Sequence, residues 1–298
     1  MIISASRRTD IPSQFPDWFF NRITAGFALV RNPFDRCQVS KVLLSPDVVD
    51  AIVFWTKNPA PMLARLGELK DYMHYFQFTI TPYGSDAEPN LPSKEDEILP
   101  TFKRLSDAIG PDRVIWRYDP ILLNHKYTLD FHIGTFGKIA NELRGYTKRS
   151  TISFIDVGYR MVKRNMRELK SIPPETQIEL ASKLAEIARN NGMAIDTCAE
   201  KIDLQHFGVE HARCIDDKLL ERLLGRNLHL GKDKTQRTEC ECVTSVDIGA
   251  YDTCKNGCLY CYANLRRNSL GDNAAEHDPL SPFILGNVCN GDRVTVRG

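Results

Sequence analysis

The sequence reads Thr151-Ile-Ser-Phe-Ile-Asp-Val157 before a helical stretch at residues 174–191, and Met193-Ala-Ile-Asp-Thr197 after it. Both flanking runs are short, apolar and rich in β-branched residues, as buried strands are. The stretch between them begins at Pro173-Pro174, repeats apolar residues on one helical face and ends at Asn191-Gly192. These residues therefore predict one strand–helix–strand unit with parallel strands.

The same alternation runs through most of the chain. The predicted strands are residues 2–6, 27–31, 50–55, 75–81, 113–118, 151–157 and 193–197, with a short eighth at 243–248. The predicted helices are residues 17–24, 59–69, 94–109, 130–143, 174–191 and 216–224. Seven or eight such units match the size of a TIM-like (β/α) barrel, so the predicted class is α/β with this barrel. A doubly wound open sheet is the competing architecture.

Composition restricts the classes of protein. The chain has 298 residues, 42% of them hydrophobic, and a net charge of +1, which gives no general signal for nucleic acid or an anionic membrane. A locally basic groove for nucleic acid is not excluded. The N-terminus lacks an apolar signal core, and no apolar run reaches the ~18 residues of a membrane span. We expect a cytoplasmic protein that does not bind membranes.

Nine cysteines are present, seven of them in the stretch from Cys214 to Cys289. A disulfide framework is disfavoured by the odd count and the missing signal, so clustered cysteines indicate metal or redox chemistry. We predict a barrel body at residues 1–235, a Cys-rich cluster-binding segment at 236–265 that completes the barrel mouth, and an irregular tail at 266–298.

The sharpest motif is the C-x3-C-x2-C spacing of Cys254, Cys258 and Cys261. Three thiolates in one tight loop can ligate three irons of a four-iron cluster and leave the fourth iron open. Gly257 allows the loop to bend, and Tyr260 is an aromatic that could pack over a ligand or shield the cluster. The alternative is a zinc knuckle, but such sites more often use C-x2-C pairs and need a fourth ligand nearby.

This motif resembles the cluster loop of radical S-adenosylmethionine (SAM) enzymes. The resemblance implies a [4Fe–4S] cluster on these three cysteines, SAM as cofactor, radical chemistry on an unknown small or medium-sized substrate, and an electron donor such as flavodoxin or ferredoxin. In that superfamily the motif usually follows the first barrel strand, whereas here it lies near the C-terminus. The resemblance therefore implies a permuted or variant radical SAM barrel. A GGE-like segment for the SAM amino group is missing after residues 2–6.

A wider resemblance covers almost the whole chain. It is carried by residues 4–12 (SASRRTDIP), 55–59 (WTKNP), 116–120 (WRYDP), 198–200 (CAE) and the C-terminal cysteines. In these motifs the chain is similar to the bacterial family described as domain of unknown function 1848. The family description implies no activity.

Four further cysteines, Cys198, Cys214, Cys240 and Cys242, precede the main motif. Together they predict a second site, for an auxiliary iron–sulfur cluster or a structural zinc ion. The alternative is that they are free thiols, because cysteine is often a small core residue.

Polar residues follow the predicted strands, where the loops of a barrel form one rim. The candidates for catalysis and binding are Arg7, Arg8, Asp10, Lys57, Asn58, Arg117, Asp119, Asp156 and Glu200. The basic side chains could bind a carboxylate or phosphate, and Asp119 and Glu200 could hold ribose hydroxyls or the SAM ammonium. The alternative is that these groups cap helices and pair with one another.

Three functions compete. The leading one is a radical SAM enzyme. The second is a zinc-stabilised barrel that binds or processes nucleotides or nucleic acid through Arg7, Arg8, Lys57 and Arg117. The third is an iron–sulfur electron carrier, which the polar rim disfavours because a carrier needs no substrate pocket.

Overall fold

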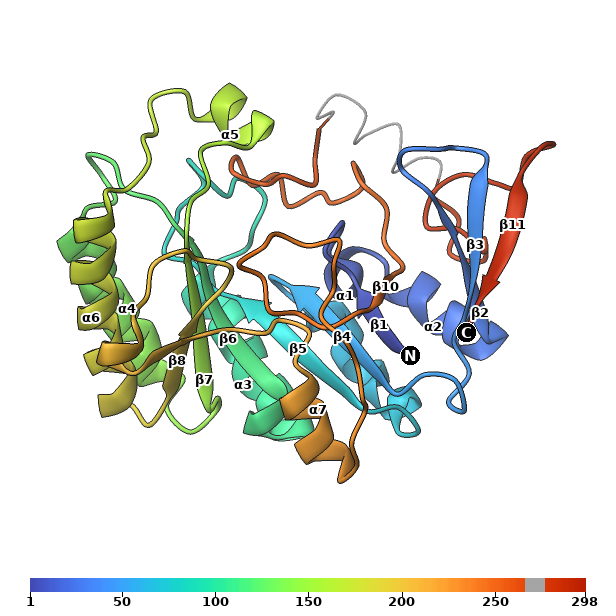
Figure 1. Ribbon diagram of the computed structural model, residues 1–298, viewed down its shortest axis with the longest axis horizontal. Helices are drawn as coiled ribbons and strands as arrows, with labels where there is room; N and C mark the ends of the chain where they lie inside the picture. Colours follow the sequence, from blue (N-terminus) through green and yellow to red (C-terminus); the bar gives the residue numbers. More distant parts are fainter. Residues whose placement is uncertain (266–276) are drawn as a thin grey trace. The chain divides into compact units, whose positions relative to one another are not determined.

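The computed structural model describes residues 1–265 and 277–298 and has an α/β architecture (Figure 1). The strands are β1 (Ile2–Ala5), β2 (Phe27–Arg31), β3 (Gln38–Leu43), β4 (Ala51–Thr56), β5 (His74–Thr79), β6 (Val114–Ile121), β7 (Arg149–Phe154), β8 (Ala194–Thr197), β9 (Val209–His211), β10 (Val246–Asp247) and β11 (Arg293–Arg297). The α-helices are α1 (Ile11–Gln14), α2 (Pro16–Ala25), α3 (Leu99–Ile109), α4 (Leu129–Glu142), α5 (Arg160–Asn165), α6 (Pro174–Asn190) and α7 (Asp217–Leu224). Shorter or tighter helical segments are η1 (Ala60–Leu69), η2 (Lys94–Ile98), η3 (Pro111–Arg113) and η4 (Gln205–Phe207).

The chain divides into two compact units. The first comprises residues 1–75, 245–257 and 263–298, and the second comprises residues 76–244 and 258–262. In the first unit, β1 pairs in parallel with β10 on one side and with β4 on the other. The strand β1 is buried at all four positions, as expected for a strand with neighbours on both edges.

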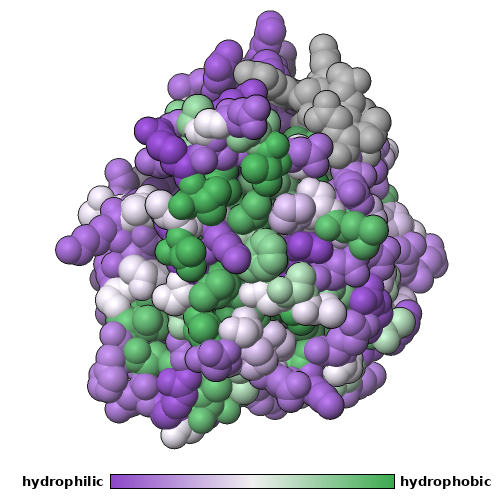
Figure 2. Space-filling view, turned by 90° about the vertical axis from the view of Figure 1, so that its right-hand side faces the viewer, coloured by the Kyte–Doolittle hydropathy of each residue, from purple (hydrophilic) through white to green (hydrophobic). Residues whose placement is uncertain are grey.

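The first unit also contains a separate three-stranded sheet, in the order β11-β3-β2. The strands β2 and β3 are antiparallel, and β11 adds to β3 in parallel. Every residue of β11 is exposed, including Val294 and Val296. Figure 2 shows the face on the right of Figure 1, where β11 lies, with hydrophobic side chains emerging between hydrophilic ones.

In the second unit the order is β5-β6-β7-β8-β9, and every printed pairing is parallel. One face of this sheet is covered by helices: Trp116 of β6 stacks on Phe136 of α4 at 4.6 Å between ring centroids, and α4 packs on α6. The side chain of Tyr118 lies on the same face and contacts His132 of α4. Alternate residues of the same strands, such as Arg117, point to the opposite face.

The predicted alternation of strands and helices is confirmed for β1, β4, β5, β6, β7, β8, α2, α4, α6 and α7. Residues 27–31 do form a strand, but the prediction that it joins a parallel sheet is wrong because β2 pairs antiparallel with β3. The strands β3 and β9 were not predicted. The closure of a barrel and the division at residues 235 and 265 stay predictions.

The predicted irregular tail needs one correction. Arg293–Arg297 forms the strand β11, which is held by pairing with β3. Residues 266–276 of that segment lie outside the described residues. In the part of the chain that the structure describes, helices are too short or too polar to span a bilayer.

Candidate functional site

Four cysteine side chains contact one another in series in the second unit. The sulfur atoms of Cys198 and Cys214 lie 3.2 Å apart. The thiol of Cys214 also interacts with that of Cys242, and Cys242 with Cys240. All four are free thiols, and all but Cys198 are buried. The structure thus brings together the four cysteines that the sequence assigned to a second site.

Strand ends position these thiols. Cys198 follows β8, and its N–H donates to the carbonyl of Ile152 in β7, which extends the sheet pairing by one residue. Cys214 comes shortly after β9, and the N–H of the next residue, Ile215, donates to the sulfur of Cys242 at 3.4 Å. Backbone bonding to β7 therefore fixes Cys198, the side chain of Gln77 holds the carbonyl of Cys214 at 2.9 Å, and a loop brings the C-x-C pair to them.

Arg117 is a charged group in contact with this series, which we call the four-thiol cluster. Its guanidinium donates to the sulfur of Cys214 at 2.9 Å and to the amide oxygen of Gln77 at 3.3 Å. It also forms a short ion pair with Asp119. The side chain of Arg117 is buried, so this cation is held by partners rather than by water.

Mutual contact and burial change the acidity of the thiols. A bond with Cys198 lowers the pKa of Cys214, but contact with Cys242 and burial raise it more, to about 12. A bond with Cys214 lowers the pKa of Cys242, but contact with Cys240 and burial together raise it more, to about 11. The pKa of Cys240 is lowered by its bond with Cys242. The thiol of Cys240, at one end of the series, is therefore more acidic than the thiols of Cys214 and Cys242 in its middle.

Carboxylates line the region next to Arg117. Asp119 accepts a hydrogen bond from the hydroxyl of Ser153, and Glu200 accepts one from the N–H of Phe154 at 2.8 Å. Burial raises the pKa of Glu200 to about 7. The structure therefore places Arg117, Asp119 and Glu200 near the four-thiol cluster.

Sequence reasoning missed Arg237 in this region. Its charge acts on Tyr159, Cys198, Asp156 and Glu200, and its nearest carboxylate oxygen, on Asp156, is 3.8 Å away. Arg237 stands alone in a polar stretch, so no motif or periodicity pointed to it.

The first unit collects the other predicted polar residues. Asp10 caps α1 by accepting from the N–H of Ser13, and its other oxygen accepts from the N–H of Lys57 at 2.8 Å and from the amide of Asn256. Burial raises the pKa of Asp10 to about 6, against the lowering effect of these bonds. The side chain of Asn58 accepts from the N–H of Ala60. These contacts cap the start of α1 and hold the neighbouring loops together, which is a structural role.

Arg7 and Arg8 are engaged within the first unit. The backbone N–H of Arg7 donates to Asp247 at 2.8 Å, and its guanidinium lies over Trp55. The guanidinium of Arg8 lies over Tyr251 and 3.8 Å from Asp247. Asp247 of β10 was not predicted as a site residue, because it lies inside the short predicted strand 243–248 and belongs to no motif.

The C-x3-C-x2-C loop is divided between the units. In the first unit, Gly257 has φ +71°, a conformation that glycine adopts without strain, and the backbone carbonyl of Cys254 accepts from Asn264 at 2.7 Å. In the second unit, the N–H of Leu259 donates to the carbonyl of Ala87, and Asn165 donates to the carbonyl of Leu259, both at 2.9 Å.

Tyr260 points into the second unit and is buried. Its hydroxyl forms a short hydrogen bond with Glu88, and its ring meets Tyr83 edge to face. Glu88, which sequence reasoning missed, is fully buried, accepts from Thr81 and pairs with Lys94 at 2.7 Å. Tyr260 therefore anchors the end of the cysteine loop.

The placement of side chains determines whether a metal ion could be bound as the chain stands. Within residues 1–265 and 277–298, His, Cys, Asp and Glu side chains form no group of three or more already arranged to hold a metal ion. The four-thiol cluster is a series of contacts rather than a shell around one point. Its sulfur atoms are nevertheless suitable metal ligands, since thiolates bind zinc and iron–sulfur clusters.

Comparison with known proteins gives a family and nothing more specific. No curated protein and no solved structure matches the chain. The family model described as Domain of unknown function (DUF1848) matches residues 2–263, which is most of the chain. The chain belongs to the DUF1848 family.

Proposed function

We propose that the protein is an iron–sulfur enzyme of the radical SAM type, in which Cys254, Cys258 and Cys261 ligate a [4Fe–4S] cluster. The observation that carries the proposal is the C-x3-C-x2-C spacing of three unbridged thiols in one loop. Three such ligands suit a cluster with one open iron. The substrate is unknown, and SAM is the proposed cofactor.

The residues present suit this group by donor chemistry. Cysteine thiolate is the usual ligand of iron–sulfur clusters, and Gly257 supplies the positive φ that a tight cysteine loop needs. The chemistry that a bound cluster would supply is one electron for the cleavage of SAM. The chain itself would hold the loop: the bonds of Leu259 to Ala87 and of Tyr260 to Glu88 restrict its position.

The polar groups of the second unit would bind and orient the substrate or SAM. Asp119 and Glu200 offer carboxylate oxygens for hydroxyl or ammonium groups, and Arg237 offers a cation for an acidic group. We further propose that the four-thiol cluster holds a second metal centre, either an auxiliary iron–sulfur cluster or zinc. The same proposal includes a permuted, closed radical SAM barrel and a cytoplasmic location. It also includes an electron donor such as flavodoxin or ferredoxin.

The test uses full-length protein purified and reconstituted without oxygen. Iron, sulfide and zinc contents are measured, and the reduced protein is examined by electron paramagnetic resonance with and without SAM. The variants are Cys258→Ala for the loop, Cys214→Ala for the four-thiol cluster, and Cys289→Ala as matched control, because Cys289 is exposed and far in sequence from both sets.

The proposal expects a four-iron signal that SAM perturbs, that Cys258→Ala abolishes and that Cys289→Ala retains. Cys214→Ala should lose only the metal of the second centre. Zinc in place of iron in a colourless protein would instead support the zinc-stabilised barrel that binds nucleotides or nucleic acid. A cluster indifferent to SAM would support an electron carrier.

A further inference from the structure

A cavity of about 720 Å³ lies within the second unit, between the strands β6 to β9 and the helix α7. Ligand pockets in proteins commonly have volumes of about 300–1,000 Å³. None of the residues proposed above for the cluster or for SAM lines this cavity. The cavity is therefore separate from the residues proposed to bind the cluster and SAM.

The wall of the cavity is one face of the sheet. Ile115 and Arg149 each come directly before the paired residues Trp116 and Ser150 of β6 and β7, and Asp196 of β8 is paired with Thr151 of β7. Side chains that are paired, or two residues apart, share a face of a sheet. Ile115, Arg149 and Asp196 therefore share one face of the sheet and line the cavity, together with Leu219 of α7.

Asp196 supplies a buried carboxylate to this space. Its side chain is only 8% exposed, and one oxygen lies 3.5 Å from the guanidinium of Arg149. The other oxygen, Oδ1, is buried and has no hydrogen-bond partner among the described residues. The ring nitrogen Nδ1 of His211, which also lines the cavity, is likewise buried and unpartnered there. A buried polar atom without a partner is costly, so a ligand that bonds to these atoms would gain free energy.

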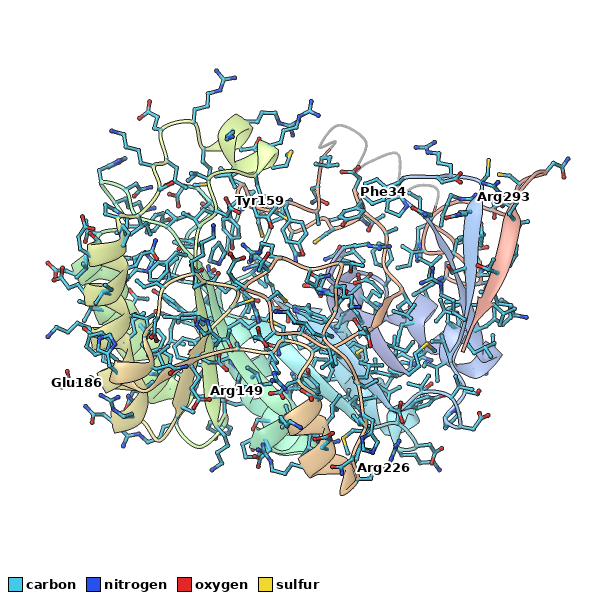
Figure 3. The ribbon with its side chains drawn as sticks, viewed as in Figure 1. Phe34, Arg149, Tyr159, Glu186, Arg226 and Arg293 are labelled. Carbon is cyan, nitrogen blue, oxygen red and sulfur yellow. The ribbon has the colours of Figure 1, made fainter. Side chains whose placement is uncertain are left out.

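The rim of the cavity carries cations. Lys148 is exposed at the start of β7 and makes no ion pair in the described part of the chain. Arg213 lies at the rim and pairs with Asp217 at 2.6 Å, while Arg149, labelled in Figure 3, pairs with Asp216 at 2.7 Å. An acidic group entering the cavity would meet Lys148 and Arg213 first.

We propose that this cavity binds an amino-acid-type zwitterion, whose ammonium group reaches Asp196 Oδ1 and whose acidic group lies toward Lys148 and Arg213. A simple anion is disfavoured because Asp112, Asp196, Glu210 and Asp216 also line the walls. A simple cation is disfavoured because the same walls carry five basic side chains. Mixed walls of this kind match a ligand with both charges. The volume leaves room for a side group or a second residue, so short peptides belong to the same class.

The test measures binding to full-length protein as purified. The standard L-amino acids and their glycyl dipeptides are tested singly by thermal shift, and those that stabilise the protein are titrated by calorimetry. Asp196→Asn keeps the shape of the side chain and removes its charge, and should weaken binding about tenfold or more, because a bond to a charged partner is lost. Ala194→Leu narrows the cavity without removing a buried charge and should weaken binding as well.

The matched control is Arg226→Gln, just beyond α7 and outside the lining, which should bind as the wild type does. For each ligand found, the amine that lacks the acid and the acid that lacks the amine should each bind about tenfold more weakly. Failure of every amino acid and dipeptide to bind would overturn the proposal. The proposal would also be overturned if Asp196→Asn and Ala194→Leu bound the ligand as tightly as the wild type does. It would be overturned as well if the amine-free acid bound as tightly as the complete ligand. None of these results depends on iron or SAM.

Discussion

The guanidinium of Arg117 donates a hydrogen bond to the sulfur of Cys214 at 2.9 Å, and with another nitrogen it pairs with Asp119. One buried cation thus links the four-thiol cluster to the carboxylates beside it. The planar fork of arginine makes this double contact possible, because its nitrogens point in fixed and different directions. Lysine, a single ammonium group on a flexible chain, cannot reproduce it.

Arg117→Lys should therefore lower the free energy of unfolding by about 3 kcal/mol, because breaking a buried charge pair leaves an uncompensated group. Urea denaturation monitored by circular dichroism measures the change. The control is Arg104→Lys, an exposed position on α3, which should change the stability little. Equal effects of the two substitutions would show that the fork of Arg117 is not important.

The bond between Tyr260 and Glu88 gives a second prediction. Tyr260→Phe removes the hydroxyl and leaves the buried Glu88 with Thr81 and Lys94 as partners. We expect a loss of about 1–2 kcal/mol in stability, the usual cost of one hydrogen bond to a charged group. Tyr146→Phe is the control, since the ring of Tyr146 contacts Lys103 at a partly buried position.

Proteolysis gives this prediction a local readout. If Tyr260 anchors the cysteine loop, limited proteolysis should cut residues 258–262 faster in Tyr260→Phe than in the control. Unchanged cutting together with unchanged stability would count against the anchor.

Local patterns predicted much of this fold. The helix α6 follows from a proline start, one apolar face and an Asn-Gly stop, and β1, β4 and β8 follow from short apolar runs. Each of these signals lies within or directly beside the element that it predicts. The small sheet could not be predicted in the same way, because β11 pairs with β3 from the other end of the chain.

The candidate site likewise contains residues that a local pattern predicted and residues that it did not. Cysteine spacing in the sequence pointed to Cys198, Cys214, Cys240 and Cys242, and their side chains do come into contact. Glu88 and Arg237 were not predicted as site residues, because neither belongs to a motif. Their roles arise from burial and from neighbours that only the folded chain supplies.

Asp10 gives a prediction about pH. Burial raises its pKa from 3.8 to about 6, so the folded state holds a proton that the unfolded state has already released. Stability should therefore fall as pH rises from about 4 to about 6, by at most about 1.4 kcal/mol per pH unit from this group. Asp10→Asn should remove that contribution, so its stability relative to wild type should rise across this window.

Denaturant titrations at several pH values measure the slope. Asp17→Asn, at an exposed position of α2, should keep the slope of the wild type. The same slope in Asp10→Asn would mean that Asp10 is charged throughout this range.

The ion pair of Arg31 and Asp292 gives the last prediction. The guanidinium of Arg31 in β2 donates to both carboxylate oxygens of Asp292, which comes directly before β11. These bonds, together with one from the N–H of Cys289, lower the pKa of Asp292 to about 2. The stabilisation is present above the unfolded value of 3.8 and is lost as pH falls toward 2. Asp292→Asn should make the amides of β11 exchange with solvent several-fold faster than in wild type, because β11 is an exposed edge strand and the ion pair ties its start to β2.

Hydrogen exchange read by mass spectrometry measures this change, with β2 of the same sheet as the internal reference. Asp47→Asn, at an exposed position, is the control and should leave the exchange of β11 unchanged. In wild type, the protection of β11 relative to β2 should decrease as pH falls below about 4, while Asp292→Asn should show no such decrease. If β11 stays protected in Asp292→Asn, its backbone pairing with β3 suffices to hold it, and the ion pair contributes nothing to the sheet.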